Sequence, residues 1–348
     1  MSYYMHSHAK HGNDLTNRIA TAKAFCLFLL AVFAWLCAAS FVCAQDSNAL
    51  IQAARNGDAN AQFELASRYA KGEGLPLDME QSIFWLEKSA AQDHVLAQMG
   101  LALAYSSGTG VPKSMEKALV WWERAADQGQ YSAMYNAALM HRQGIGTPKN
   151  PKKAVKWLEK AAGLGLGAAQ NMLGDMYYQG EGVRQSTKKA VKWYEKAAEQ
   201  KVGPAFASLG AVYLQGDNPD YKQALEWYRK GADMGDAECQ KNLGLAYTGR
   251  WGVHENLTQA VIWLGKAAKQ GHTSAQVLLA KIYFENDMID LAEEWAKEAA
   301  KAGDPKGLYL WARVLIIRED HDRAEQVMRQ SAALGYAPAK AWLERIEQ

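Results

Sequence analysis

Residues 97–129 read AQMGLALAYSSGTGVPKSMEKALVWWERAADQG, and the landmarks of this stretch recur along most of the chain. Its first alanine has counterparts at steps of 36 residues, and later of 34, 36, 32 and 32 residues: Ala61, Ala97, Ala133, Ala169, Ala205, Cys239, Ala275, Gly307 and Ala339. A period of 20 to 50 residues is typical of a solenoid. We therefore predict an array of eight repeats and not one globular core.

Each repeat contains two helical patterns joined by a turn. Offsets 0, 4, 5 and 8 from the first alanine carry small or apolar residues, with tyrosine usual at offset 8, and they share one helix face. Four repeats continue with glycines spaced as GxG, such as Gly108 and Gly110, which suit a helix C-cap and a tight reversal. The second helix is predicted to begin after a capping side chain in seven repeats: Asp78, Ser114, Asn150, Ser186, Asp220, Asn256 and Asp320.

A tryptophan follows this cap by seven residues in seven repeats. We interpret the stripe as core packing: Trp85, Trp121, Trp157, Trp193, Trp227, Trp263 and Trp295. Each ring would bury on the order of 200 Å². The stripe is therefore expected to supply much of the cohesion of the array.

These motifs resemble the Sel-one-like (Sel1) repeat, a branch of the tetratricopeptide superfamily, over eight units. The resemblance implies an all-α fold, an α/α superhelical solenoid of about eight helix-turn-helix repeats with terminal capping helices, which binds protein partners. The predicted domains are the eight-repeat solenoid at 58–337, an N-terminal capping helix at 45–57 and a C-terminal capping helix at 338–348.

Residues 1–44 have the features of a leader. The apolar run at 24–44 follows a polar segment with Lys10, Arg18 and Lys23, and it ends in small residues. This pattern predicts a secretory signal peptide cleaved after Ala44. A run of about 20 apolar residues would also span a bilayer, so the alternative is a retained N-terminal membrane anchor. Both alternatives export residues 45–348, as a periplasmic or secreted protein or as one anchored to the inner membrane.

Composition and motifs give no signal of catalysis. Beyond the leader, 36 basic residues balance 36 acidic ones, so no net field favours nucleic acid. No metal or cofactor motif is present in the sequence, and we predict that the protein is not an enzyme. Two serines have the SxxK spacing of penicillin-binding proteins, Ser114 with Lys117 and Ser186 with Lys189, but capping explains both.

A hydrolase remains the alternative function. Activity on β-lactam or cell-wall substrates has been attributed to cysteine-rich relatives of this repeat family, which carry a disulfide in each unit. Here Cys239 is the single cysteine beyond the leader, and we expect it to be a buried free thiol.

The resemblance to tetratricopeptide repeats implies that the first helices line a concave groove through offsets −1, +2, +6, +9 and +10. Residues at these offsets vary between repeats, and they include aromatic, arginine and asparagine side chains that commonly anchor peptides. The candidate partner-binding residues are Tyr135, Arg142, Asn171, Asp175, Tyr178, Lys281, Phe284, Tyr309 and Arg313.

The sequence thus predicts an exported, bacterial, non-enzymatic protein–protein interaction scaffold that holds a protein or peptide in its groove. The resemblance suggests a role in envelope homeostasis or in host interaction. A membrane-anchored assembly factor would use the same groove and would touch the membrane only through residues 24–44. The partner's identity and the oligomeric state stay open.

Overall fold

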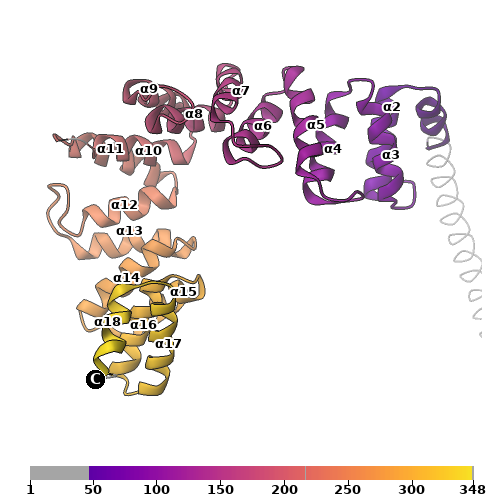
Figure 1. The fold of residues 1–348 in the computed structure, drawn as a ribbon. Coiled ribbons are helices and arrows are strands. Elements are labelled where there is room, and N and C mark those ends of the chain that lie inside the picture. The colour runs from indigo at the N-terminus through magenta and orange to yellow at the C-terminus, as the bar shows by residue number, and fades with distance from the viewer. Residues whose placement is uncertain (1–46, 216, 347–348) are drawn as a thin grey trace, which may run out of the picture. The chain divides into compact units, whose positions relative to one another are not determined.

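The computed structural model describes residues 47–215 and 217–346, and all regular secondary structure within them is helical (Figure 1). A helical segment at 47–55 comes first. The helices that follow are α2 (Ala59–Lys71), α3 (Met79–Ala90), α4 (Val95–Ser107), α5 (Met115–Asp127), α6 (Tyr131–Gln143), α7 (Pro151–Gly163), α8 (Gly167–Gln179), α9 (Thr187–Glu199), α10 (Gly203–Tyr213), α11 (Tyr221–Asp233), α12 (Ala237–Ala246), α13 (Leu257–Lys269), α14 (Thr273–Glu285), α15 (Ile289–Lys301), α16 (Pro305–Ile317), α17 (His321–Ala333) and α18 (Ala337–Ile346). The predicted all-α fold of paired helices is confirmed.

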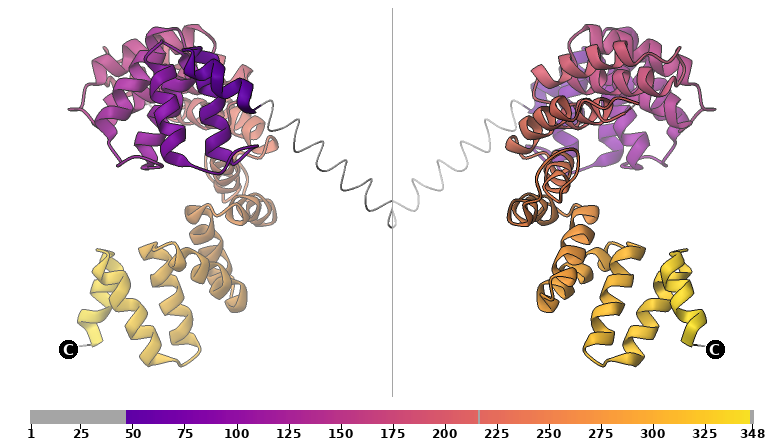
Figure 2. Two further views of the ribbon diagram at one scale, coloured as in Figure 1. Left: turned by 90° about the vertical axis from the view of Figure 1, so that its right-hand side faces the viewer. Right: turned by 90° about the vertical axis from the view of Figure 1, so that its left-hand side faces the viewer.

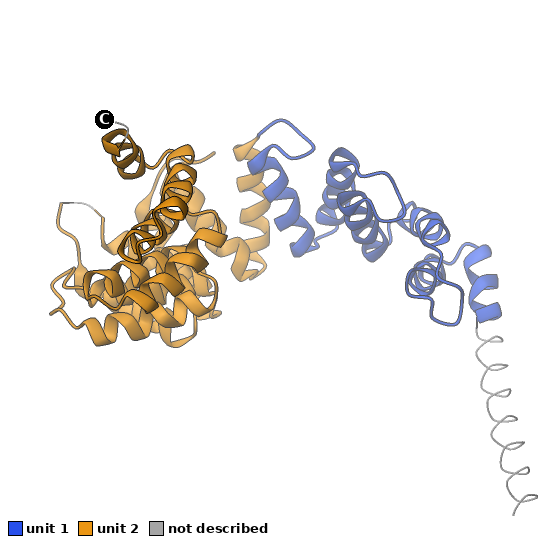
Figure 3. Cartoon of the chain, turned by 90° about the horizontal axis from the view of Figure 1, so that it is seen from below, with its two compact units in different colours: residues 1–149 blue, residues 150–348 orange. Residues whose placement is uncertain are grey.

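The chain forms two compact units, residues 1–149 and residues 150–348 (Figure 3). In the first unit α2 to α6 pack each against the next, and in the second unit α7 to α18 do the same. The turned views of Figure 2 show this succession of helical hairpins in the second unit. The sequence predicts one continuous array, whereas the division falls between the two helices of the third repeat. Division is compatible with a repeat protein because each repeat packs mainly against its neighbours.

The predicted caps of the second helices are confirmed. In all seven repeats the capping side chain accepts a hydrogen bond from the backbone N–H three residues ahead. Met288 makes no such bond before α15. Each cap contributes about 1 kcal/mol to stability. The turn glycines also behave as predicted: Gly108 ends α4 in the left-handed conformation, with φ 83°.

The tryptophan stripe is only partly in the core. Trp85, Trp157 and Trp263 are buried, whereas the other four tryptophans of the stripe are half-buried. In six of the seven repeats the residue after the tryptophan is more deeply buried than the tryptophan, and Tyr194 is only 2% exposed. A cation three residues later covers the outer face of five of these rings, at ring distances of 3.7 to 4.7 Å: Arg124, Lys160, Lys196, Lys230 and Lys266. The indoles therefore lie at the edge of the core, where four of the seven are partly exposed to solvent.

Buried glutamines link successive repeats. Gln98 donates Nε2 to the carbonyl of Ala90, and it accepts a bond from Gln128 Nε2 at 2.8 Å. The same pairing joins residues 30 positions apart at Gln62 and Gln92, Gln170 and Gln200, and Gln240 and Gln270. We call this series the glutamine ladder. Met134 and Phe206 interrupt it at the corresponding positions of repeats three and five, and it ends after repeat six, because Gln276 has Lys306 30 residues later and Leu308 replaces the glutamine of repeat eight.

The side chain at offset 8 from the first alanine of a repeat forms a second link between successive repeats. Tyr105 and Tyr177 donate their hydroxyls to glutamates 18 residues earlier, and Tyr177 lies 3.1 Å from Glu159 Oε1. His141 replaces tyrosine in repeat three and keeps the link, with its Nε2 2.7 Å from Glu123 Oε1. A glutamate of one second helix thus connects to the next first helix.

The termini complete the description. The predicted leader at 1–44 lies outside the described residues, as do residues 45 and 46. Within residues 47–215 and 217–346, no helix combines the length and the apolar character needed to cross a bilayer.

Candidate functional site

The nine predicted groove residues lie on first helices, in three groups. Tyr135 and Arg142 are on α6 in the unit of residues 1–149, where both are half-buried and both interact with other residues. The other seven belong to the unit of residues 150–348, on α8 and on the adjacent helices α14 and α16. The structure does not bring all nine into one cluster.

The α8 group consists of Asn171, Asp175 and Tyr178. Their spacing of four and three residues places them on one side of the helix. Asp175 Oδ1 accepts a hydrogen bond of 2.8 Å from the hydroxyl of Tyr194 on α9. Burial and the nearby Asp175 carboxylate both raise the pKa of Tyr194, so its hydroxyl stays protonated and can donate.

Two polar atoms of the α8 group have no internal partner. The side-chain oxygen of Asn171 and the hydroxyl of Tyr178 are shielded from solvent, and no described residue hydrogen-bonds to either. A shielded polar group without a partner costs about 1–3 kcal/mol, and so such groups are rare in folded proteins. The two residues are seven positions apart, which corresponds to about 10 Å along the helix axis. Once a side-chain rearrangement uncovers them, the two atoms could bond two backbone groups of an extended chain, which advances about 3.3 Å per residue.

The second group joins α14 to α16. The Arg313 guanidinium lies 4.4 Å from the ring centroid of Phe284 and 5.9 Å from that of Tyr309. The Tyr309 ring meets Tyr336 edge to face at 5.3 Å. Arg313 is exposed and the aromatic rings are half-buried, so a ligand could reach both the cation and the ring edges. This cluster brings together three of the predicted residues.

Lys281, the remaining predicted residue, lines a neighbouring hollow of about 410 Å³. It forms an ion pair of 3.6 Å with Glu285, and both side chains are largely exposed. Other lining residues are Leu245 and Thr248, which belong to the sixth repeat. These two residues are not among the nine predicted groove residues. They occupy offsets +6 and +9 of the sixth repeat, so the offset rule identifies them once it is applied to every repeat.

Charge in the sixth repeat is arranged around one carboxylate. Glu238 lies 2.9 Å from His272 Nε2 and 2.5 Å from Lys241 Nζ. The hydrogen bond from His272, aided by Lys241, lowers the pKa of Glu238 to about 2. The carboxylate therefore stays ionised at neutral pH and accepts a hydrogen bond from His272, which links α12 to the start of α14.

The serine and cysteine positions have structural roles in this fold. Ser114 and Ser186 accept capping bonds from the backbone N–H of Lys117 and Lys189. Each lysine ammonium lies over a tyrosine ring, at 5.1 Å for Lys117 and 4.9 Å for Lys189. Cys239 is a free, buried thiol whose pKa is raised by burial. Among the described residues, no three His, Cys, Asp or Glu side chains are grouped so that they could hold a metal ion.

The chain matches a known family of repeat proteins, one match for each of seven repeats. The Sel1 repeat model matches residues 59–94, 95–130, 132–166, 167–202, 207–236, 237–272 and 273–304. No curated protein sequence matches significantly.

Two solved structures are similar over most of the chain. The c5321 protein of uropathogenic Escherichia coli, a protective antigen with an SLR fold, is 32% identical; the match covers 87% of this chain and 67% of that chain, with a TM-score of 0.69. A Sel1 repeat protein from Oxalobacter formigenes is 26% identical, with 88% and 93% of the two chains covered and a TM-score of 0.74.

Proposed function

This chain belongs to the Sel1 repeat family, and from that premise we propose that it is an exported, non-enzymatic scaffold that binds a protein or peptide along its first helices. Proteins built from Sel1 repeats generally act as protein-interaction scaffolds. The observation that carries the proposal here is the contrast on α8. On this helix the hydroxyl of Tyr177, at offset 8, donates a hydrogen bond to Glu159. The side-chain oxygen of Asn171 and the hydroxyl of Tyr178 have no hydrogen-bond partner among the described residues.

The groove residues supply the chemistry that peptide recognition needs. Asn171 and Tyr178 can accept and donate hydrogen bonds to a backbone, because an amide oxygen accepts and a phenol does both. Phe284, Tyr309 and Arg313 form an aromatic and cationic surface of the composition that dominates binding hot spots. We infer that a partner binds to the second unit through both groups.

Export rests on the sequence of the leader. A positive flank, an apolar run and small residues before Gln45 favour translocation of residues 45–348. The similar E. coli protein is a protective antigen. We propose a periplasmic or secreted scaffold, or one held at the inner membrane by residues 24–44, in envelope homeostasis or host interaction. The mass of the mature protein decides between cleavage and anchoring.

Affinity capture from the native cell tests the scaffold. The bait is the tagged full chain, and the captured proteins are identified by mass spectrometry. The triple variant Tyr135→Ala, Tyr178→Ala, Tyr309→Ala should lose the specific partner, while Tyr221→Ala should retain it. Tyr221 is a suitable control because it is an exposed tyrosine on a second helix, 41% accessible. Equal capture by the triple variant and the native chain would rule out binding along the first helices.

A further inference from the structure

The GxG turns cover the beginning of the preceding second helix. In repeat two, a Cβ placed on Gly110 would lie 3.0 Å from Ile83 Cγ1 and 3.0 Å from the carbonyl oxygen of Met79. Met79 is the first residue of α3, and Ile83 is one turn further along it. Glycine suits this position because a Cβ would crowd the backbone and side chains of α3, and because the φ of Gly110, 72°, is one that other residues rarely adopt. The turn thus acts as a lid on the first turn of its neighbour.

Repeat seven lacks this lid. The connection between α4 and α5 has seven residues, 108–114, whereas the connection between α14 and α15 has three, 286–288. The neighbour that loses its cover is α13, whose first residue and fifth residue are Leu257 and Val261. These two correspond to Met79 and Ile83 in the covered repeat.

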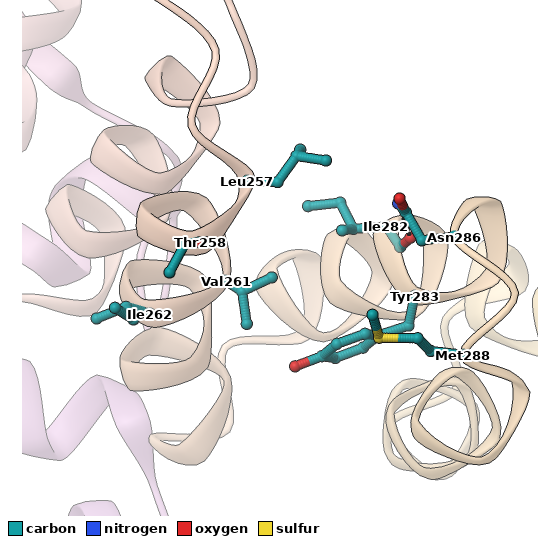
Figure 4. A pocket seen from close by; sticks show the side chains of 8 residues that line it. All are labelled: Leu257, Thr258, Val261, Ile262, Ile282, Tyr283, Asn286 and Met288. Atoms are coloured by element: carbon teal, nitrogen blue, oxygen red, sulfur yellow. Dashed lines mark hydrogen bonds between the residues drawn. The ribbon is translucent and has the colours of Figure 1, made fainter.

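A pocket of about 310 Å³ lies at this place. Leu257 and Val261 point from α13 toward Ile282 and Tyr283 of α14, with Met288 beside them (Figure 4). The volume is near the lower end of the range for ligand pockets, about 300–1,000 Å³. The walls of the pocket are largely apolar, and none of its lining residues is charged.

Repeat eight shows how a lost turn can be compensated. Its connection is equally short, residues 318–320. Arg318 reaches back to the first turns of α15, where it pairs with Asp290, and its Nε lies 2.9 Å from Glu293 Oε2. Repeat seven has no equivalent, because α13 offers Thr258 and Val261 at the positions of the two carboxylates.

Tyr283 gives the pocket a hydrogen-bond donor. In three other repeats the side chain at offset 8 bonds a glutamate 18 residues earlier, but the residue 18 positions before Tyr283 is Gly265. Tyr283 therefore lacks the carboxylate that these three side chains have at that position. Burial and the charge of Glu294 on α15 raise the pKa of Tyr283, so its hydroxyl stays protonated and can donate. Its hydroxyl points toward α13 (Figure 4).

We propose that this pocket binds a glycine–aliphatic–proline turn of a partner polypeptide. Such a turn would take the place that Gly110, Val111 and Pro112 occupy within the chain itself at repeat two. Apolar, uncharged walls suit the aliphatic side chain, and the Tyr283 hydroxyl suits a backbone carbonyl. The pocket borders the hollow lined by Lys281, with which it shares Leu257, Ile282 and Asn286. This site is separate from the proposed groove, and binding to it does not depend on Asn171 or Tyr178.

A turn peptide tests the proposal directly. The probe is the fluorescently labelled peptide SSGTGVPKS, the sequence of residues 106–114, titrated into the full chain and followed by anisotropy. We expect saturable binding, and at least tenfold weaker binding of a peptide with aspartate in place of the valine. Absence of saturation up to about 1 mM peptide would overturn the proposal.

Two variants locate the binding. Replacing residues 286–288 with residues 108–114 restores the lid and should reduce peptide affinity at least tenfold. Gly265→Glu returns the carboxylate to Tyr283 and should weaken binding about threefold or more; a Cβ there meets no atom within 4 Å, so folding should be preserved. Unchanged affinity in both variants would overturn the assignment.

Two controls separate the alternatives. Tyr178→Phe, in the proposed groove, should leave affinity for the turn peptide unchanged, so that failure of one site can be told from failure of the other. Light scattering of the full chain tests a second copy as the occupant. A dimer that disappears when the lid is restored would assign the pocket to self-association and contradict the assignment to a partner.

Discussion

Two adjacent tyrosines of α8 allow the proposed groove to be tested by removing single oxygen atoms. The Tyr177 hydroxyl donates to Glu159 Oε1 at 3.1 Å, whereas the Tyr178 hydroxyl is shielded and has no partner among the described residues. Tyr177→Phe and Tyr178→Phe each remove one hydroxyl and keep the ring. The two variants are therefore matched in chemistry and position, and they differ only in the role of the lost oxygen.

The expected effects on stability are opposite. Tyr177→Phe loses a hydrogen bond to a solvent-exposed carboxylate, which we estimate at about 1 kcal/mol. For a unit of this size that corresponds to a melting temperature lower by about 2–4 °C. Tyr178→Phe removes a hydroxyl that is desolvated without compensation, so stability should stay the same or rise by up to about 1 kcal/mol.

The effects on binding should be reversed. If the Tyr178 hydroxyl bonds a partner, its loss removes about 0.5–1.5 kcal/mol and weakens binding about 2- to 12-fold. Tyr177→Phe should bind the captured partner with native affinity. Titration calorimetry and thermal melting measure both quantities. A lower melting temperature for Tyr178→Phe together with native partner affinity would refute the reasoning, since the hydroxyl would then have a structural role.

Three further predictions concern stability. Gly174→Ala should destabilise the protein by at least about 2 kcal/mol in denaturant unfolding, because the added Cβ would lie 2.5 Å from the buried ring of Tyr194. Asn150→Ala should cost about 1 kcal/mol through loss of the α7 cap, and Asn150→Ser should recover most of it. Glu238 has a lowered pKa, so its contribution is complete above about pH 4.5 and is lost as the pH falls toward 2. Because Glu238 is half exposed, we expect that contribution to be below about 1 kcal/mol, and Glu238→Gln should flatten the acid limb of the stability curve by this amount.

The repeat pattern made most of the fold predictable. Helix pairs, turn glycines and caps follow from local rules, so Ser114 and Asn256 could be assigned as caps from position alone, and the structure confirms both. The burial of the tryptophans was less predictable. Trp121 is followed by Trp122, and sequence periodicity does not decide which of two adjacent apolar residues is deeper; the structure buries Trp122.

The links between repeats were missed, although their signals recur. Glutamates two residues after the tryptophans, such as Glu87 and Glu159, have partners 18 residues later, and the glutamine ladder has a step of 30 residues. Both depend on how one hairpin packs on the next, which local propensity does not encode. The groove residues Asn171 and Tyr178 were selected by offset alone, and their role remains a prediction.

The interruptions of the glutamine ladder have a mechanical consequence. Repeats three, five and eight carry Met134, Phe206 and Leu308 where the other five repeats carry a glutamine. Gln276 of repeat seven has Lys306 and not a glutamine 30 residues later, so these four repeats lack the paired amides. Apolar contacts tolerate sliding better than hydrogen bonds, which fail beyond a narrow range of distance and angle. Under force applied to the two ends of the chain, for example in an optical trap, we expect extension to proceed in discrete steps, and the first ruptures to occur at the repeats without paired amides, which are repeats three, five, seven and eight.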